Sequence, residues 1–357
     1  MKKEDLTGKV QTVLGIVDAD SLGITIVHEH LLHDMEIHFI EPDAASERHL
    51  AHQPVGFDNL WWVRLNESRN LDNLRLIDEQ LAIKEAMFYK LAAGKTIVEV
   101  TVPGVFGRDP LGLLHIASAT NLNIIMGSGY YAGPSHIHQP AIKNDQEFTE
   151  EIVKDILVGV GNTGVHAGII GEIHCSAFLK DSERNILRCC AAAQRQTGAP
   201  LSIHPSPNDD LALEIIKILK EAGADLRHTI IGHIDLSGFS RDTCHKLAEA
   251  GCFIAYDNFG LEGLLELPGL GHAVELNDRL RINDIMNLIS DGYLDYILVS
   301  QDLATKHRLT SYGGLGYAHI LRDIIPLMRA RGLSEEQEYK LLVDNPRRVL
   351  SFFCPGG

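Results

Sequence analysis

Two histidines separated by a single residue, His28 and His30, follow a run of mostly β-branched, apolar residues at 24–27. Such a run is typical of a short buried strand. Because side chains alternate along a strand, both imidazoles should lie on one face, while Glu29 points to the other. Two imidazoles on one rigid strand are suited to bind a metal ion. The pattern alone fits core or loop histidines equally well, since the chain contains 18 histidines.

Other side chains that can bind metals stand at the ends of later apolar runs. They are Glu172, His204, His233 and Asp302. Such side chains are poorly suited to burial without a partner or a metal. Four histidines and two carboxylates exceed the three protein ligands that a catalytic zinc usually has. The set instead suits two divalent metal ions bridged by a carboxylate and a hydroxide.

The elements that must position these residues alternate between strand-like and helix-like patterns. The eight strand-like runs cover 24–30, 96–101, 123–128, 168–173, 200–204, 229–233, 252–257 and 296–302. Amphipathic stretches between them cover 74–93, 145–160, 182–197, 209–222, 241–250 and 278–290. This alternation predicts an α/β protein with a parallel (β/α)8 TIM barrel. The alternative is a doubly wound open sheet, which normally has a glycine-rich phosphate turn after its first strand.

The barrel prediction explains where the candidate ligands fall. Active sites of such barrels lie at the C-terminal ends of the strands. The candidate ligands come from the ends of five predicted strands, so they should converge at one rim.

We predict a single domain over 1–357, with a small N-terminal hairpin in 1–23, the barrel over 24–334, and a C-terminal helix and tail over 335–357. A long polar stretch, 33–70, follows the first strand. Because loops of this length are uncommon unless functional, we expect it to form a partial lid over the site.

Composition narrows the class of partner. The chain is 45% apolar and 22% charged, as in globular proteins, and has no apolar run long enough to span a membrane. Its formal charge of −16 argues against nucleic acid or an anionic membrane as partner, which leaves a small-molecule substrate. The N-terminus lacks the apolar segment of a signal peptide. The six cysteines lack C-x-x-C spacing, so we expect reduced thiols and a cytoplasmic protein.

The order H-x-H, a ligand on the fourth strand, two single histidines and a last Asp resembles the amidohydrolase superfamily. From about residue 8 to 350, the chain resembles its phosphotriesterase-related branch. The segments that carry the resemblance are 8–15, 28–31, 107–109, 167–173, 203–205, 232–235, 312–317 and 345–346.

The resemblance implies a ligand set. His28, His30 and Asp302 would bind one metal ion, His204 and His233 the other, and Glu172 would bridge them. Phosphotriesterases proper use a carbamylated lysine as the bridge, whereas Gly171 and Glu172 stand here. Zinc is the first candidate, with Mn, Co or Fe also suited to these ligands. Relatives also suggest a homodimer.

The substrate-binding residues are less defined, and we name Tyr131, His174 and Asp257 as candidates. Tyr131 follows the third strand and could line the pocket or simply pack. His174 shares a strand face with Glu172, so it could contact substrate, crowd the metals, or turn aside to a loop. Asp257 is followed by Asn258, where phosphotriesterases have a histidine that serves proton transfer. Organophosphate hydrolysis is therefore expected only as a side activity.

Another cluster of basic residues follows Asp302. Lys306, His307 and Arg308 could meet an anionic group of the substrate, or could belong to a solvated loop.

These observations predict a binuclear metal-dependent hydrolase. The resemblance implies that it cleaves a carboxyl-ester, lactone or amide bond, the amides including N-acyl amino sulfonates. The bridging hydroxide attacks, one metal polarises the oxygen, and Asp302 is the catalytic residue that receives the proton. The alternative is a non-catalytic, metal-containing ligand-binding protein. A metal-assisted isomerase or decarboxylase also stays open, because fold does not determine chemistry.

Overall fold

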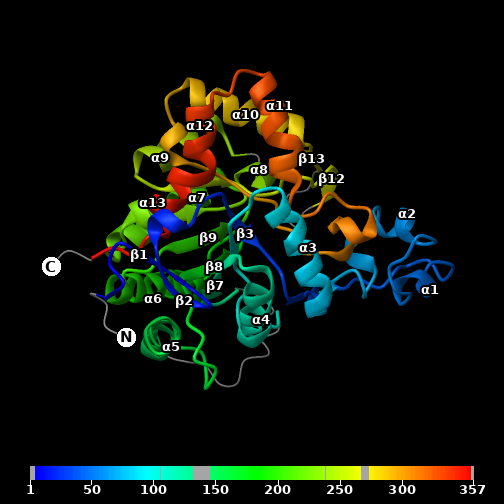
Figure 1. The fold of residues 1–357 in the computed structure, drawn as a ribbon, viewed down its shortest axis with the longest axis horizontal. Helices are drawn as coiled ribbons and strands as arrows, with labels where there is room; N and C mark the ends of the chain where they lie inside the picture. The colour runs from blue at the N-terminus through cyan, green and yellow to red at the C-terminus, as the bar shows by residue number, and fades with distance from the viewer. Residues whose placement is uncertain (1–4, 105, 132–144, 238, 267–272, 355–357) are drawn as a thin grey trace.

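The computed structural model describes residues 5–104, 106–131, 145–237, 239–266 and 273–354. Within these residues, eight parallel strands form one sheet in the order β14-β11-β10-β9-β8-β7-β6-β3 (Figure 1). The strands are β3 (Thr25–Glu29), β6 (Thr96–Glu99), β7 (Asn123–Ser128), β8 (Ile169–Cys175), β9 (Leu201–Pro205), β10 (Thr229–Ile231), β11 (Phe253–Tyr256) and β14 (Ile297–Val299). All eight overlap the predicted runs, and the (β/α)8 barrel is confirmed.

The two end strands of this sheet meet through the residues that follow β14. Ser300 Oγ lies 3.0 Å from His28 O, and the His28 amide donates to Ser300 Oγ over 2.9 Å. The Asp302 amide donates to the same carbonyl over 3.1 Å. These bonds join β3 to β14 and nearly close the barrel.

Glu29 strengthens this junction from the other side of the strand. Its fully buried carboxylate accepts hydrogen bonds from Ser300 Oγ, Gln301 N and Leu303 N at 2.7, 2.8 and 3.1 Å. Burial raises the pKa of Glu29 to about 7, although these hydrogen bonds oppose the rise. The prediction that Glu29 points away from the two histidines is therefore confirmed.

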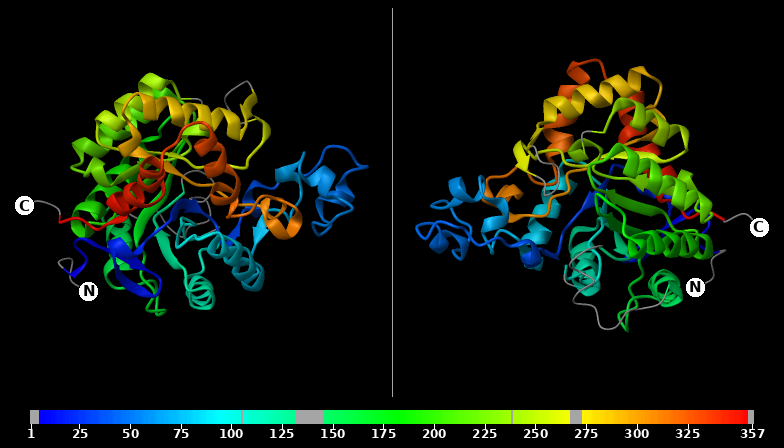
Figure 2. Two further views of the ribbon diagram at one scale, coloured as in Figure 1. Left: turned by 45° about the horizontal axis from the view of Figure 1, so that its top comes forward. Right: turned by 180° about the vertical axis from the view of Figure 1, so that it is seen from behind.

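Helices cover the outside of the barrel (Figures 1 and 2). The longer ones are α3 (Glu79–Leu91), α4 (Pro110–Thr120), α5 (Asp145–Leu157), α6 (Asp181–Thr197), α7 (Asp209–Glu221), α9 (Arg241–Glu249) and α10 (Asp278–Ser290). Shorter helical segments are α8 (Ile234–Ser237), η6 (Leu226–His228), η7 (Leu294–Tyr296), η8 (Lys306–Arg308), η9 (Thr310–Tyr312), η10 (Ile320–Ile324), α11 (Ile325–Ala330), α12 (Glu335–Tyr339), η11 (Lys340–Asp344) and α13 (Asn345–Leu350).

Local sequence explains where these helices begin. Asp109 caps α4 by accepting from Gly112 N over 3.0 Å, with Pro110 as the first helical residue. The helix predicted from residue 74 starts only at Glu79, because β5 (Arg75–Leu76) first pairs with β4 (His33–Asp34). The pairing explains why the apolar pattern there begins before the helix does.

The N-terminal segment forms the predicted hairpin, in which β1 (Lys9–Thr12) pairs antiparallel with β2 (Gly15–Asp18), followed by η2 (Ala19–Ser21). Gln11 Nε2 donates to Ile156 O and Ala167 O, just before β8. One buried apolar cluster joins Val10 with side chains of seven barrel strands. The hairpin thus packs at the N-terminal end of the barrel, opposite the predicted site.

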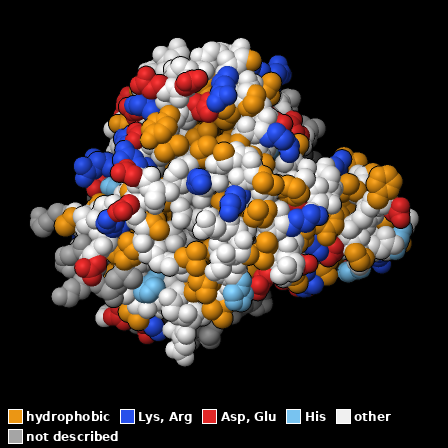
Figure 3. Space-filling view, viewed as in Figure 1, with side chains coloured by type: hydrophobic (Ala, Val, Ile, Leu, Met, Phe, Trp, Pro, Cys, Tyr) orange, Lys and Arg blue, Asp and Glu red, His pale blue; other side chains and the backbone are white. Residues whose placement is uncertain are grey.

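The polar stretch after β3 forms a projecting arm, residues 36–71, with η3 (Glu36–His38), α1 (Arg48–Ala51), α2 (Leu60–Val63) and η4 (Glu67–Arg69). Figures 1 and 2 show α1 and α2 standing away from the barrel, so most of the stretch is not the expected lid. The arm exposes Phe57, Trp61 and Leu65, and Figure 3 shows hydrophobic side chains gathered on it. A trio of apolar side chains, Val55, Trp62 and Val63, gives the arm its own small core.

A second antiparallel pair, β12 (Gly263–Glu266) with β13 (Ala273–Leu276), follows β11. Among the described residues, no helix has both the length and the apolar character that crossing a membrane requires.

Candidate metal centre

The six predicted ligands come together at the C-terminal ends of their strands. Glu172 lies at their centre: its Oε2 is 2.6 Å from His204 Nδ1, 3.4 Å from His28 Nε2 and 3.6 Å from His233 Nε2. Its Oε1 is 3.7 Å from His30 Nε2. One carboxylate therefore faces all four histidines.

Asp302 completes the set from the opposite side of the barrel junction. Its Oδ1 is 3.2 Å from His30 Nε2 and 3.8 Å from His28 Nε2. Its side chain is 21% exposed, compared with 7% for Glu172, so Asp302 is the more accessible of the two acids.

The backbone is specialised where it presents these ligands. His233 and Asp302 have φ angles of 53° and 45°, a region that non-glycine residues rarely adopt. Gly171, with φ 124°, precedes Glu172, and a Cβ there would lie only 2.4 Å from Ser202 O. A glycine is thus required for β8 to pass β9 closely and present Glu172. Such backbone outliers cluster at functional sites.

A buried carboxylate, Asp257, lies behind two of the histidines. Its Oδ1 accepts from the backbone N of His233 over 2.9 Å and faces His233 Nδ1 at 3.0 Å, while its Oδ2 faces His28 Nδ1 at 3.4 Å. The side chain of Asp257 is fully buried. A carboxylate there favours a proton on each Nδ1 and leaves each Nε2 lone pair directed at the centre.

His30 is oriented in the same way by a hydroxyl. Thr101 Oγ1 donates to Glu99 Oε1 over 2.6 Å, so it accepts from His30 Nδ1, 2.7 Å away. The Nε2 of His30 then carries a lone pair that can bind a metal ion. His30 and His233 thus have a hydrogen-bonded group that fixes this tautomer, while His28 has only the longer contact between its Nδ1 and Asp257.

The electrostatics of the centre favour cations. Burial alone would lower the pKa of His28, but Glu172, Asp257 and Asp302 raise it to about 9. Burial would raise the pKa of Glu172, yet the neighbouring His204 and His28 hold it well below its usual range. The Glu172 carboxylate therefore stays ionised in a buried place, and it creates a negative potential around the histidine nitrogens.

The donor set fits a metal centre by its geometry as well. The side chains form three groups, and within each group the potential ligand atoms lie within 4.8 Å of one another. The groups are His28–His30–Glu172, Glu172–His204–His233 and His28–His233–Asp302. Neither ring nitrogen of His28 has a hydrogen-bond partner among the described residues, although both are buried. Imidazole and carboxylate donors in this number suit divalent transition metals.

A cavity of about 110 Å³ lies above the ligands. It is lined by His30, His33, Met35, His38, Thr101, Val102, Phe106, Tyr131, Glu172, His204, Asp302 and Ala304. The rings at its mouth stack on one another: His33 lies on Phe106 with centroids 5.4 Å apart and an interplanar angle of 7°. Burial lowers the pKa of His33 and of His38, which keeps both rings neutral near pH 7.

The three residues named as substrate contacts occupy different places. Tyr131 lines the cavity, as its position after the third strand suggested. His174 stacks on Tyr131, with centroids 4.5 Å apart, and its ring meets that of His204 edge-on at 4.8 Å. Burial lowers the pKa of His174 to about 4. Asp257 does not reach the cavity; it lies behind the histidines, because its strand ends one residue before it and its side chain turns beneath them.

The basic residues after Asp302 have partners within the protein. Lys306 Nζ donates to Asp72 Oδ1 over 2.5 Å. The Arg308 guanidinium donates to the carbonyls of Gln301 and Asp302 over 2.5 and 2.6 Å. Both cations therefore stabilise loops, and the solvated-loop interpretation is wrong for the buried Arg308.

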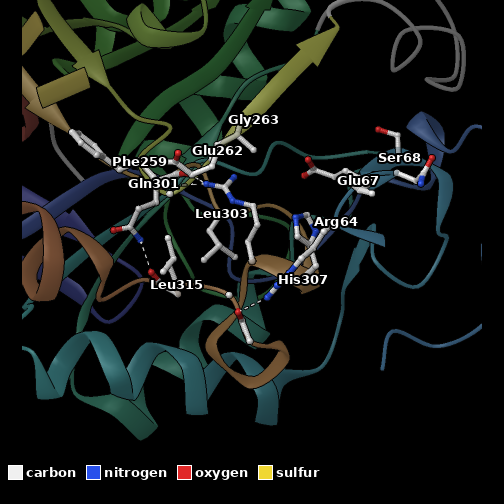
Figure 4. A pocket seen from close by; sticks show the side chains of 18 of the residues that line it. Arg64, Glu67, Ser68, Phe259, Glu262, Gly263, Gln301, Leu303, His307 and Leu315 are labelled. Carbon is white, nitrogen blue, oxygen red and sulfur yellow. Dashed lines mark hydrogen bonds between the residues drawn. The ribbon is translucent and has the colours of Figure 1, made fainter. Parts of the chain in front are cut away.

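A larger cavity of about 790 Å³ lies beside the centre, between the arm and the loops after β11 and β14. Figure 4 shows Leu303, Arg64 and His307 lining it. Arg64 donates from Nη2 to Gly313 O over 2.6 Å, which ties the arm to the loop after β14.

Sequence reasoning missed the residues at the cavity mouth and behind the ligands. His33, Thr101 and Phe106 stand near the ends of β3 and β6, and that position was the available signal. Arg281 and Asp235, which pair behind the centre, gave no signal because they are 46 residues apart in sequence.

Comparisons with known proteins identify the family of the chain. The family model described as the phosphotriesterase family matches residues 8–350. An N-acetyltaurine hydrolase from Dictyostelium discoideum is 39% identical over 364 residues, and the match covers 96% of this chain and 98% of that protein.

Two solved structures are similar along almost the whole chain. A resiniferatoxin-binding protein from Rhodobacter sphaeroides has a TM-score of 0.91 and 34% identity, with 98% of each chain covered. A lactonase from Listeria monocytogenes has a TM-score of 0.72 and 25% identity, with 96% of this chain and 99% of that chain covered. Together with the family match, these similarities show that the chain belongs to the phosphotriesterase family and is a metal-dependent hydrolase.

Proposed function

We propose that the protein is a binuclear metal-dependent hydrolase that cleaves the amide bond of a small N-acylated amine, with N-acetyltaurine as the first substrate to test. The observation that carries the binuclear centre is the position of Glu172, whose carboxylate lies within 3.7 Å of a nitrogen of each of four histidines. The named activity of the Dictyostelium discoideum relative supports the amide. Carboxyl esters and lactones, which share the acyl carbon, are the rival substrates.

The proposed ligand assignment follows the grouping of the side chains. His28, His30 and Asp302 would hold one ion, His204 and His233 the other, and Glu172 would bridge them. Zinc is the first candidate, and Mn, Co and Fe suit the same donors. Bound there, two divalent ions would polarise the acyl oxygen and make water nucleophilic near neutral pH.

Asp302 is the proposed catalytic residue. His30, His28 and His233 hold its pKa below the usual range despite burial, so its carboxylate is unprotonated near neutral pH, as a proton acceptor must be. When water adds to the acyl carbon and the carbon–nitrogen bond breaks, Asp302 takes the proton of the water and passes it to the leaving nitrogen. The accessible position of this carboxylate at the cavity supports the role.

The cavity walls have a different proposed role. Val102 and Phe106 would form an apolar wall that excludes water from the acyl group. Tyr131 would contact the substrate from the mouth of the cavity. His174, stacked on Tyr131, would set the position of that ring. We propose Asp257 as a residue that orients ligands, in place of the substrate contact expected from the sequence.

The test is a substrate panel with the purified chain after loading with Zn, Mn or Co. We expect turnover of N-acetyltaurine above that of aryl esters and lactones, loss of activity with a chelator, and recovery when metal is restored. Faster lactone than amide turnover would change the substrate class but leave the metal chemistry in place. Activity that survives complete metal removal would contradict the proposal.

Organophosphate esters belong in the same panel. Asn258 stands where the phosphotriesterase pattern has a proton-relaying histidine, and its amide cannot carry a proton as an imidazole does. Turnover of these esters should therefore be low.

A second candidate function is ligand binding without turnover, which the similarity to the Rhodobacter sphaeroides resiniferatoxin-binding protein favours. It predicts saturable binding of resiniferatoxin and no product from any substrate of the panel. The homodimer and the cytoplasmic location stay predictions, which size-exclusion chromatography with light scattering and cell fractionation would test.

A further inference from the structure

A buried ion pair lies behind the metal centre, outside the ligand set. Arg281 on α10 donates from Nε to Asp235 Oδ2 over 2.6 Å. Both side chains are only 2% exposed. Burying such a pair is costly, and replacing it with apolar groups often costs nothing in stability. Because such a pair contributes little to stability, its position close to the centre indicates a role beyond packing.

The pair is connected to the centre through Asn258. The Asn258 amide N donates to Asp235 Oδ2 over 3.0 Å, and its Nδ2 donates to Asp235 Oδ1 over 3.1 Å. The same Nδ2 lies 3.0 Å from Asp257 Oδ1, to which it also donates. Both oxygens of Asp235 are thus used to hold one asparagine against Asp257.

Asp257 in turn faces two ligand histidines. Its Oδ1 is 3.0 Å from His233 Nδ1, and its Oδ2 is 3.4 Å from His28 Nδ1. These histidines belong to different proposed metal sites, so one carboxylate orients a ligand of each ion. A shift of Asp257 would disturb both ions together.

We propose that Arg281 is a positioning residue of the metal centre. It fixes Asp235, and through Asn258 it fixes the carboxylate that orients His28 and His233. The planar guanidinium suits this task, because Nη1 also donates to Asp278 Oδ1 over 2.9 Å. Asp278 accepts from Gly260 N at 2.9 Å, so α10 and the segment after β11 are joined at the same point.

A second buried pair provides the matched control. Arg108 Nη1 lies 2.9 Å from Asp155 Oδ2, and the two side chains are 5% and 8% exposed. Asp155 also accepts from Ser128 Oγ, at the end of β7, a strand that carries none of the six ligands. Losing this pair should lower stability in a similar way without touching the centre.

The inference rests on the metal centre of the proposed function, so the readout is metal binding and not turnover. Native protein, Arg281→Met and Arg108→Met are stripped of metal, and the affinity and number of bound Zn²⁺ ions are measured by competition with a chromogenic chelator. Thermal unfolding of the metal-free proteins measures the loss of stability separately. We expect the Arg281→Met variant to bind both ions about ten- to a hundredfold more weakly, as is usual for groups that support ligands. The Arg108→Met variant should bind them like the native protein.

Two further variants keep the test decisive if Arg281→Met does not fold. Arg281→Lys keeps the charge but loses the planar arrangement of donors, so it should weaken binding less. The double variant Arg281→Met with Asp235→Asn removes both buried charges and keeps an acceptor for Asn258. It should bind Zn²⁺ more tightly than Arg281→Met alone.

Equal weakening in the Arg281→Met and Arg108→Met variants would reduce Arg281 to a structural role and overturn the inference. Native affinity in either folded variant at position 281, Met or Lys, would overturn it too. A native protein that binds no Zn²⁺, Mn²⁺ or Co²⁺ would instead overturn the proposed function together with the inference, so the two failures are distinguishable.

Discussion

The floor of the site and its mouth are held in place by different forces. The floor consists of the six proposed ligands, His28, His30, Glu172, His204, His233 and Asp302, with their supporting groups. Its side chains are charged or hydrogen-bonded groups, supported by others such as Asp257 behind His233 at 3.0 Å and Thr101 behind His30 at 2.7 Å. The mouth consists of His33, His38, Phe106, Tyr131 and His174, whose rings stack or meet edge-on at centroid distances of 4.5 to 6.5 Å.

This difference separates what can change from what cannot. A buried ionic group that loses one partner is left uncompensated, which costs several kcal/mol. A stacked ring pair contributes only about 1 kcal/mol beyond its buried area. Substitutions at the floor should therefore abolish chemistry or metal binding, while substitutions at the mouth should adjust substrate binding.

The largest effect is expected at Asp302. Asp302→Asn keeps the shape and one oxygen ligand but removes the group that accepts the proton. We expect kcat to fall by about 10²–10⁴-fold while most of the metal stays bound. Single-turnover kinetics and metal analysis of the same sample check this. Near-native turnover in a metal-loaded variant would remove Asp302 from its role.

A loss of stability of comparable size is expected at Glu29, on the opposite face of the strand that carries His28 and His30. Glu29→Ala leaves the buried amides of Gln301 and Leu303 without their acceptor, while Ser300 Oγ keeps His28 O within reach. The free energy of unfolding should fall by about 3–5 kcal/mol. Chemical denaturation of the metal-free protein measures it. Glu29→Gln keeps one acceptor oxygen and should lose distinctly less; equal losses would mean that side-chain volume, not hydrogen bonding, stabilises the junction.

The barrel and the convergence of the six candidate ligands could be predicted from sequence because both depend on local rules. Apolar runs of strand length mark the eight strands, and a polar side chain at the end of each run must lie at the rim of a parallel barrel. His204 and His233 are identified in this way although 29 residues separate them. Closure of the barrel then brings Asp302 next to His30, and no local sequence pattern links these two distant residues.

The features that sequence analysis missed depend on where side chains point and where loops run, which a sequence does not show directly. Asp257 has the same position at a strand end as the ligands, yet its side chain lies behind them instead of facing the cavity. The polar composition of 33–70 predicts a loop but not whether it crosses the mouth or projects from the side. Arg308 looks like a solvent-exposed cation in sequence, but three backbone carbonyls accept its hydrogen bonds.

The role of Asp257 leads to the next prediction. In Asp257→Asn, the NH2 of the new amide replaces one carboxylate oxygen and faces the Nδ1 of either His28 or His233. The histidine that faces this NH2 can no longer keep a proton on Nδ1. That ring then carries its proton on Nε2 and cannot bind a metal through it. We expect metal affinity to fall by about ten- to a hundredfold, measured by chelator competition.

Asp155→Asn is the control for that experiment, because Asp155 is a similarly buried carboxylate that pairs with Arg108, outside the ligand set. It should leave metal affinity unchanged. Unchanged affinity in Asp257→Asn as well would mean that Asp257 does not set the tautomers.

The smallest effect is expected at the mouth, in His174→Ala. The substitution removes the ring that stacks on Tyr131 at 4.5 Å and leaves each of the six ligands in place. Loss of one ring pair worth about 1 kcal/mol should change KM by roughly fivefold, with kcat and metal content close to native. Steady-state kinetics on the best substrate of the panel, with metal analysis, separate the two quantities. A hundredfold fall in kcat, or loss of an ion, would place His174 with the floor, because its ring also meets that of His204 at 4.8 Å. The division between floor and mouth would then lie between His174 and Tyr131.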